Sequence, residues 1–100
     1  MFKGTKYLTK GVQSVIGLDL QILMWSMIDQ WRDKIELDYL QVFELSIVEE
    51  NGVLFQKIIH SQEEPEYREE NFYKIADPVN GEVWIMDSGE YCTMLLPEEN

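Results

Sequence analysis

The spacing of apolar residues changes once along this chain, from a helical period before Asp38 to strand-like runs after it. Over 19–34, a rotation of about 100° per residue gathers the apolar side chains into one arc roughly 140° wide. The residues of that arc are Leu20, Leu23, Met24, Met27, Ile28 and Trp31. Asp19 suits the N-cap or first turn, and Lys34 suits the C-terminal end. The pattern predicts one amphipathic helix over 19–34.

The residues after Asp38 are rich in β-branched and aromatic types, which favour strands. Two such runs, 39–48 and 53–60, are separated by Asn51-Gly52, a pair that is typical of a tight hairpin. Further turn signals indicate more strands. These are expected at 71–76, 82–87 and 91–96, with a short alternating edge strand at 5–10.

The hairpin at Asn51-Gly52 allows two registers. A two-residue turn would place Phe43 opposite His60. A three-residue loop with a glycine bulge would place Phe43 opposite Ile59, and His60 opposite Val42 on the more polar face. The second register gathers the apolar residues better, so we favour it.

The predicted fold class is therefore α+β: one domain over 1–100, with a strand, a helix and then an antiparallel meander, about five to six strands in all. One helix covers only one face of a sheet. The strand at 82–87, however, carries Val83 and Ile85 on one side and Trp84 and Met86 on the other. We expect such a sheet to curl toward a half-barrel, with dimerisation as the alternative.

The charge of the chain is strongly negative, with 19 acidic against 8 basic residues and a net charge of −11. Residues 1–17 form an exception, since they carry Lys3, Lys6 and Lys10 and no acid. A surface this acidic disfavours direct binding to nucleic acid or to anionic membranes.

The chain has no apolar run of membrane-spanning length and no signal-peptide pattern, and its single cysteine fits a reducing cytoplasm.

The octapeptide "HSQEEPEY" at 60–67 holds the only histidine beside several glutamates. His60, Glu63 and Glu64 are weak candidate ligands for a divalent ion. Alternatively, the strand ends at His60 and residues 61–71 form an acidic loop, either plain or used in protein recognition. The recognition candidates in that loop are Glu63, Glu64, Glu66, Tyr67, Glu69 and Glu70.

The sequence contains no pattern that favours catalysis. Cys92 lies in a predicted strand, where apolar surroundings leave a thiol inert. No serine stands in a G-x-S-x-G elbow, and no glycine-rich phosphate loop is present. We therefore assign no catalytic residues and expect no cofactor.

Two apolar residues, Ile22 and Trp25, fall outside the apolar arc of the predicted helix. Trp25 is either buried beneath the N-terminal strand or the acidic loop, or forms with Ile22 part of a subunit or partner interface, where tryptophan is enriched.

Four stretches, "KYLTKGV" (6–12), "ELDYLQVFELSI" (36–47), "QKIIHSQEEPEY" (56–67) and "TMLLPEE" (93–99), resemble an uncharacterised family, domain of unknown function 960 (DUF960). Its members are short proteins of Gram-positive bacteria and their mobile elements. The resemblance implies a bacterial cytoplasmic protein and implies no activity, so no catalytic role is transferred.

These observations favour a small acidic cytoplasmic protein that acts as a non-catalytic protein-interaction or regulatory module, with an unidentified protein partner or as a homodimer. One alternative is an acidic mimic of nucleic acid that occupies a basic DNA-binding protein. Another is a metal-dependent enzyme acting on a small molecule.

Overall fold

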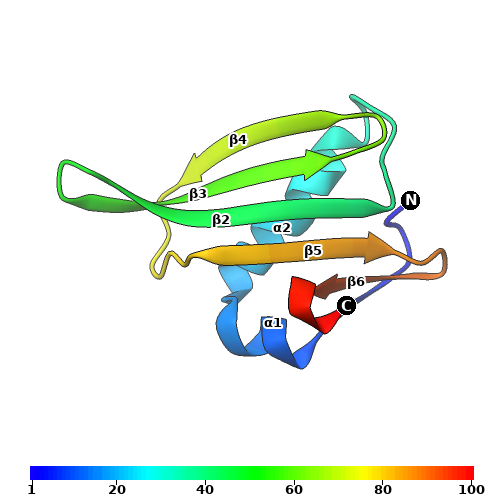
Figure 1. The fold of residues 1–100 in the computed structure, drawn as a ribbon, viewed down its shortest axis with the longest axis horizontal. Helices are drawn as coiled ribbons and strands as arrows, with labels where there is room; N and C mark the ends of the chain where they lie inside the picture. Colours follow the sequence, from blue (N-terminus) through cyan, green and yellow to red (C-terminus); the bar gives the residue numbers. More distant parts are fainter.

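One six-stranded mixed sheet and two helices make up the chain, and the computed structural model describes all residues from Met1 to Asn100 (Figure 1). In chain order the elements are β1 (Thr5–Leu8), α1 (Lys10–Val15), α2 (Leu18–Trp31), β2 (Leu40–Glu50), β3 (Val53–Gln62), β4 (Tyr67–Tyr73), β5 (Gly81–Asp87), β6 (Tyr91–Leu95) and a short 3-10 turn, Pro97–Glu99. Figure 1 shows α2 behind the sheet and α1 near its lower end.

The strands lie in the order β1-β6-β5-β2-β3-β4. β2, β3 and β4 form a meander, after which the chain crosses back so that β5 pairs with the other side of β2. β5 and β6 form the predicted hairpin, and β1 pairs with β6 in parallel. The α+β class and the strand number are confirmed. The parallel pair was not predicted, and the sheet is open rather than closed, so the expected curling is not confirmed.

Both helices differ from the prediction. α1 is an additional helix, because Thr9 ends the edge strand by acting as an N-cap: its hydroxyl accepts from the Val12 amide at 3.2 Å. α2 begins one residue before Asp19, with Gly17 as its N-cap. It ends at Trp31 rather than at residue 34, and Ile35 N–H still bonds back to Trp31 C=O at 3.1 Å in a closing turn.

The hairpin register that we favoured is wrong. Asn51 and Gly52 have φ angles of 52° and 80°, which form the two-residue turn that twists with the strands. Glu50 consequently pairs with Val53, and Phe43 lies opposite His60. In this register the His60 side chain lies on the face of the sheet toward α2. Counting apolar residues favoured the wrong register because the count treated every polar side chain as exposed.

The predicted acidic loop over 61–71 is also wrong in most of its length. β3 continues past His60 to Gln62, and β4 begins at Tyr67. Only 63–66 form the turn between them. The strand predicted at 71–76 therefore lies earlier, at 67–73, whereas β5 and β6 match their predicted ranges within one residue.

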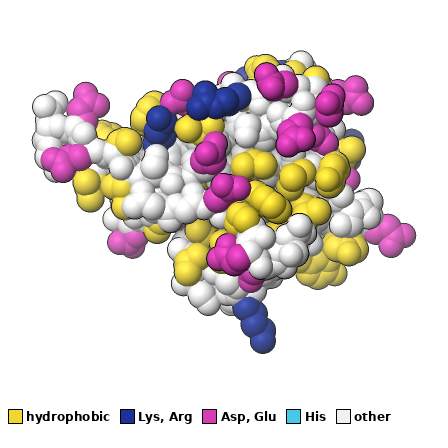
Figure 2. All heavy atoms as spheres, in the orientation of Figure 1, with side chains coloured by type: hydrophobic (Ala, Val, Ile, Leu, Met, Phe, Trp, Pro, Cys, Tyr) yellow, Lys and Arg dark blue, Asp and Glu magenta, His cyan; other side chains and the backbone are white.

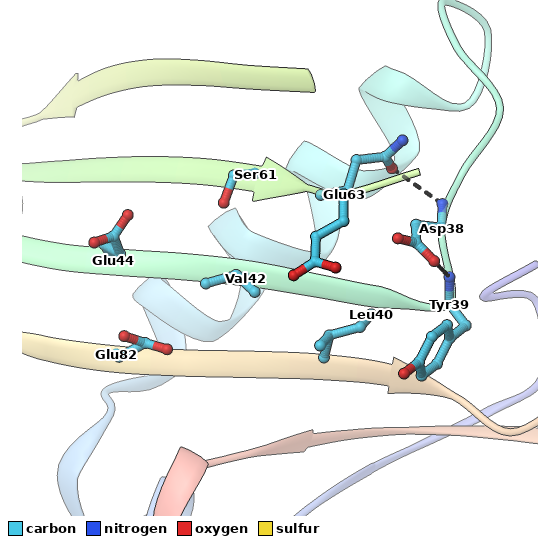
Figure 3. Close-up of a pocket in the computed structure, with 9 residues that line it drawn as sticks. Asp38, Tyr39, Leu40, Val42, Glu44, Ser61, Glu63 and Glu82 are labelled. Carbon is cyan, nitrogen blue, oxygen red and sulfur yellow. Dashed lines mark hydrogen bonds between the residues drawn. The ribbon is translucent and has the colours of Figure 1, made fainter. Parts of the chain in front are cut away.

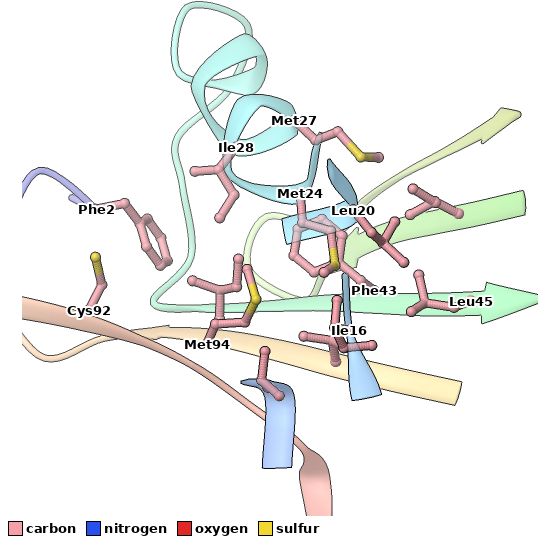
Figure 4. Close-up of a cluster of buried hydrophobic side chains, with 14 of the residues drawn as sticks. Phe2, Ile16, Leu20, Met24, Met27, Ile28, Phe43, Leu45, Cys92 and Met94 are labelled. Atoms are coloured by element: carbon pink, nitrogen blue, oxygen red, sulfur yellow. The ribbon is translucent and has the colours of Figure 1, made fainter. Parts of the chain in front are cut away.

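The apolar core lies between α2 and the sheet. Leu20, Met24 and Ile28 of α2 face Phe43 of β2 and Met94 of β6, and all five are almost fully buried (Figure 4). The arc predicted from the helical period is therefore the buried side of the helix, with Leu23 at its half-buried margin.

Gly4 provides a stability prediction at the junction before β1. A Cβ at this position would lie 2.2 Å from the backbone oxygen of Glu90, which cannot move as a flexible side chain can. We expect Gly4→Ala to cost about 1–3 kcal/mol in free energy of unfolding. At Gly17 the nearest atom to such a Cβ is a side-chain oxygen of Asp19, at 3.0 Å. Gly17→Ala, measured by the same urea titration, is the control and should cost about 0.5–1 kcal/mol, the difference between glycine and alanine at an N-cap. Equal losses would contradict the account.

Candidate functional site

Apart from the short 3-10 turn that follows β6, the face of the sheet turned away from α2 has no helix over it (Figure 1). We call it the open face. Its side chains come from alternate positions of the strands. Among those from β1 to β3 are Tyr7, Leu40, Val42, Glu44, Ile59, Glu82, Trp84, Met86, Tyr91 and Thr93. Yellow apolar side chains gather over this part of the sheet in Figure 2.

Four apolar side chains form a square at the centre of the open face. Val42 pairs with Trp84, and Leu40 pairs with Met86, on the adjacent strands β2 and β5. We call these four residues the apolar quartet. Each is half-buried, and α2 lies on the opposite face of the sheet. Toward the β1 edge the exposed rings of Tyr7 and Tyr91 pack edge to face, 5.8 Å between centroids.

Carboxylates border the quartet. Glu44 and Glu82 lie directly opposite each other in the register of β2 and β5. Glu82 Oε2 accepts a hydrogen bond from the Trp84 indole at 2.6 Å. Together with Asp38 and Glu63 they line a hollow of about 340 Å³ whose floor includes Leu40 and Val42 (Figure 3). The full lining is Asp38, Tyr39, Leu40, Val42, Glu44, Ser61, Gln62, Glu63 and Glu82, with no lysine or arginine.

The basic residues on this face are already paired. On the β3–β4 side, Lys57 Nζ lies 3.1 Å from Glu70, and Arg68 Nη1 lies 3.5 Å from it. The hydrogen bond and the charge of Lys57 lower the pKa of Glu70. None of the four carboxylates that line the hollow takes part in an ion pair. The uncompensated charge around the quartet is therefore negative.

His60 lies on the opposite, helix-covered face, fully buried. Its ring is stacked between Trp31, with centroids 3.6 Å apart, and Phe43, at 4.3 Å. Nε2 lies 2.6 Å from Gln41 Oε1, and Nδ1 has no partner. Burial lowers the pKa of His60 to about 3. The imidazole is therefore neutral, with Nε2–H donating to Gln41. Its predicted place on the polar face is wrong.

A relay of buried glutamines links His60 to the hollow. Gln41 Nε2 donates to Gln62 Oε1 at 2.8 Å and to the Asp38 carbonyl at 2.9 Å. Gln62 Oε1 also accepts from the Asp38 amide at 3.1 Å, and Gln62 Nε2 donates to the carbonyl of Pro65 at 2.8 Å. The relay thus fastens the two loops that carry Asp38 and Glu63 at the rim of the open face.

The metal ligands considered from the sequence do not converge. His60 points toward α2, Glu63 lines the hollow on the other face, and Glu64 is exposed in the turn. No three His, Cys, Asp or Glu side chains gather as a potential metal site. Cys92 is buried, which raises the pKa of its thiol, and Sγ lies 3.7 Å from the Thr5 carbonyl.

The recognition residues expected in the acidic loop are divided between both faces. Tyr67 packs edge to face on Trp31, with centroids 4.8 Å apart. Glu69 accepts from the Trp31 indole and lies 3.7 Å from Lys34. Glu64 and Glu66 are exposed in the turn, whereas Glu70 is on the open face. They do not form one contact surface.

The two helix residues proposed for an interface differ in exposure. Ile22 is 59% exposed and lines an open groove with Leu23, Tyr73 and Ile75. Trp25 is half-buried against the core, with Lys6 Nζ 5.4 Å from its ring centroid. Trp25 is thus partly covered by the N-terminal strand, and an interface at Ile22 and Trp25 stays a prediction.

Sequence reasoning identified the signal for the quartet but not its composition. The two-sided apolar pattern of Trp84 and Met86 indicated an uncovered face. Leu40 and Val42 were not singled out, because only the pairing of β2 with β5 brings them beside Trp84 and Met86. That pairing joins strands that are far apart in the sequence.

The family model described as "Staphylococcal protein of unknown function (DUF960)" matches residues 5–99. The chain belongs to this family. A solved structure described as "Crystal structure of the protein of unknown function from Enterococcus faecalis" is similar, with a TM-score of 0.79 at 25% sequence identity, covering 97% of this chain and 91% of that chain. A comparison with curated proteins found no match. No helix in this DUF960 protein is long and apolar enough to cross a membrane.

Proposed function

We propose that this DUF960 protein is a non-catalytic protein-interaction module that docks a basic protein partner on the open face of its sheet. The observation that supports this proposal is the uncovered apolar quartet, bordered by carboxylates that have no basic partner within the chain. A cytoplasmic location and a regulatory role belong to the same proposal.

The chemistry of the quartet suits protein contact. Its side chains are partly exposed, so a partner that covers them removes apolar area from solvent, which contributes about 25 cal/mol per Å². Trp84 is central among them, and tryptophan and tyrosine are the residues that most often dominate interface energies. Tyr7 and Tyr91 extend the aromatic surface toward the β1 edge.

The negative charge of the open face favours a basic partner. Glu44, Glu82, Asp38 and Glu63 surround the hollow without a compensating base, and the whole chain carries −11. A basic surface would meet these carboxylates favourably. A second copy docked by the same face would place like charges together, so a homodimer through the open face is disfavoured.

The test uses tagged protein and a lysate of the bacterium that encodes it. We expect Trp84→Ser with Met86→Ser to weaken capture of the partner by about 30-fold or more, the range of a hot-spot loss. Ile22→Ser, an exposed apolar position on the helix side, is the matched control and should leave capture unchanged. The partner is identified by mass spectrometry, and its contact surface should be basic.

Three outcomes would overturn the proposal. Capture that survives the Trp84/Met86 variant would exclude the open face. Loss on Ile22→Ser would instead place the contact on the helix side. A captured DNA-binding protein that DNA displaces, regardless of Trp84, would support nucleic-acid mimicry. Each variant's fold is checked by circular dichroism before capture, and an unfolded variant is replaced by Trp84→Gln with Met86→Gln.

A further inference from the structure

We infer that the partner presents an amphipathic segment, with apolar side chains on the quartet and a lysine or arginine side chain between Glu44 and Glu82. This inference rests on the proposed function and names the chemistry that the open face recognises.

The register of β2 and β5 places the carboxylates of Glu44 and Glu82 close enough for one cation to contact both. Residues directly opposite on neighbouring antiparallel strands have Cβ atoms about 4.5–5.5 Å apart, and like charges there destabilise a sheet. Glu44 and Glu82 occupy such positions, and neither forms an ion pair within the chain. A partner cation between them relieves the repulsion and gains two charge-assisted contacts.

The charged and apolar parts of the surface are adjacent. Val42 lies two positions before Glu44 on β2, and Trp84 lies two positions after Glu82 on β5, so each step is about 7 Å along the strand. The bond from the Trp84 indole orients one Glu82 oxygen. A partner therefore needs its basic side chain next to its apolar ones, which excludes a uniformly charged segment.

The open face also contains an internal control. Glu70 lies on the same face, but Lys57 and Arg68 already satisfy it. Its carboxylate therefore offers little to a partner. The inference assigns recognition of the basic side chain to Glu44 and Glu82 alone, and assigns the apolar contact to the quartet.

The probe is a 14-residue peptide of leucine and lysine with one apolar and one basic side, titrated into ¹⁵N-labelled protein and followed by NMR. We expect chemical-shift changes at the residues of the quartet and at Glu44 and Glu82. The variant Glu44→Gln with Glu82→Gln should weaken binding by about tenfold and flatten the dependence of Kd on salt. Asp33→Asn with Glu36→Gln removes the same charge from exposed positions in the segment after α2 and should leave Kd within about twofold. A hexalysine peptide should bind more weakly than the amphipathic one.

The inference is overturned if the peptide perturbs the helix side instead, if the two double variants weaken binding equally, or if hexalysine binds as tightly. These failures are distinct from a failure of the proposed function. If the Trp84/Met86 variant loses the captured partner while the Glu44/Glu82 variant keeps it at every salt concentration, the docking face stands and only the basic contact is wrong.

Discussion

At pH 4.5 the protein is expected to lose about 2–3 kcal/mol of its pH 7 stability through His60 alone. Burial between Trp31 and Phe43 lowers the pKa of His60 to about 3. The unfolded imidazole has a pKa near 6.5, so between pH 6.5 and 3 the unfolded chain binds a proton that the folded chain excludes. Stability therefore falls as the pH drops through this window.

Urea unfolding at pH 7, 6, 5 and 4.5 measures the effect. His60→Phe keeps a ring between Trp31 and Phe43 but removes the titrating group. The carboxylates are the same in both proteins, so the difference between their pH slopes isolates His60. We expect the wild type to fall more steeply by nearly 1.4 kcal/mol per pH unit below pH 6. Parallel slopes would contradict a neutral, buried His60, and an NMR titration of the imidazole with a midpoint above pH 5 would do so directly.

Trp31→Ala is expected to lower the free energy of unfolding by about 3–5 kcal/mol, which is a large part of the stability of a domain this size. Trp31 is 1% exposed, and its ring contacts three other side chains. It stacks on His60, meets Tyr67 edge to face, and donates its indole N–H to Glu69. Removing the Trp31 ring leaves a cavity against the stacked face of the His60 imidazole.

Trp84→Ala is the matched control for that variant. It deletes the same kind of ring from the open face, where the side chain is partly exposed and α2 lies on the other side of the sheet. We expect a loss of less than about 1.5 kcal/mol by urea unfolding, because little cavity forms. Similar losses for the two tryptophans would mean that both faces of the sheet are core, and would weaken the docking proposal as well.

The helix and the strands after Asp38 were predictable because their signals are local. The apolar period of α2 and the β-branched runs of β2 and β3 depend on neighbours within one element. α1 was missed because six residues with a single buried side chain, Val12, carry too short a period to detect. Of the candidate site, the sequence predicted only that one apolar face of the sheet has no helix to cover it.

The register of β2 and β3 illustrates why the remainder was not predictable. A count of apolar residues treats His60, Gln41, Gln56 and Gln62 as exposed. All four are buried, because each finds hydrogen-bond partners that exist only after the loops at Asp38 and Pro65, and the crossover at Val79, are in place. Burial of a polar group depends on distant partners, which no local pattern reveals.

By itself, the sequence determined the α+β class, the buried arc of α2, the presence of a hairpin at Asn51-Gly52 (though not its register) and the strong negative charge. Each of these follows from residue type and short-range spacing. Only the tertiary structure decided that His60 is core, that Glu44 faces Glu82, and that Leu40 and Val42 join Trp84 and Met86 in one uncovered quartet. The last two relations arise from the pairing of β2 with β5 across more than thirty residues of chain. The burial of His60 depends on the register of β2 with β3 and on its hydrogen bond to Gln41. In both cases long-range hydrogen bonding and burial act together, and spacing along the sequence carries no signal.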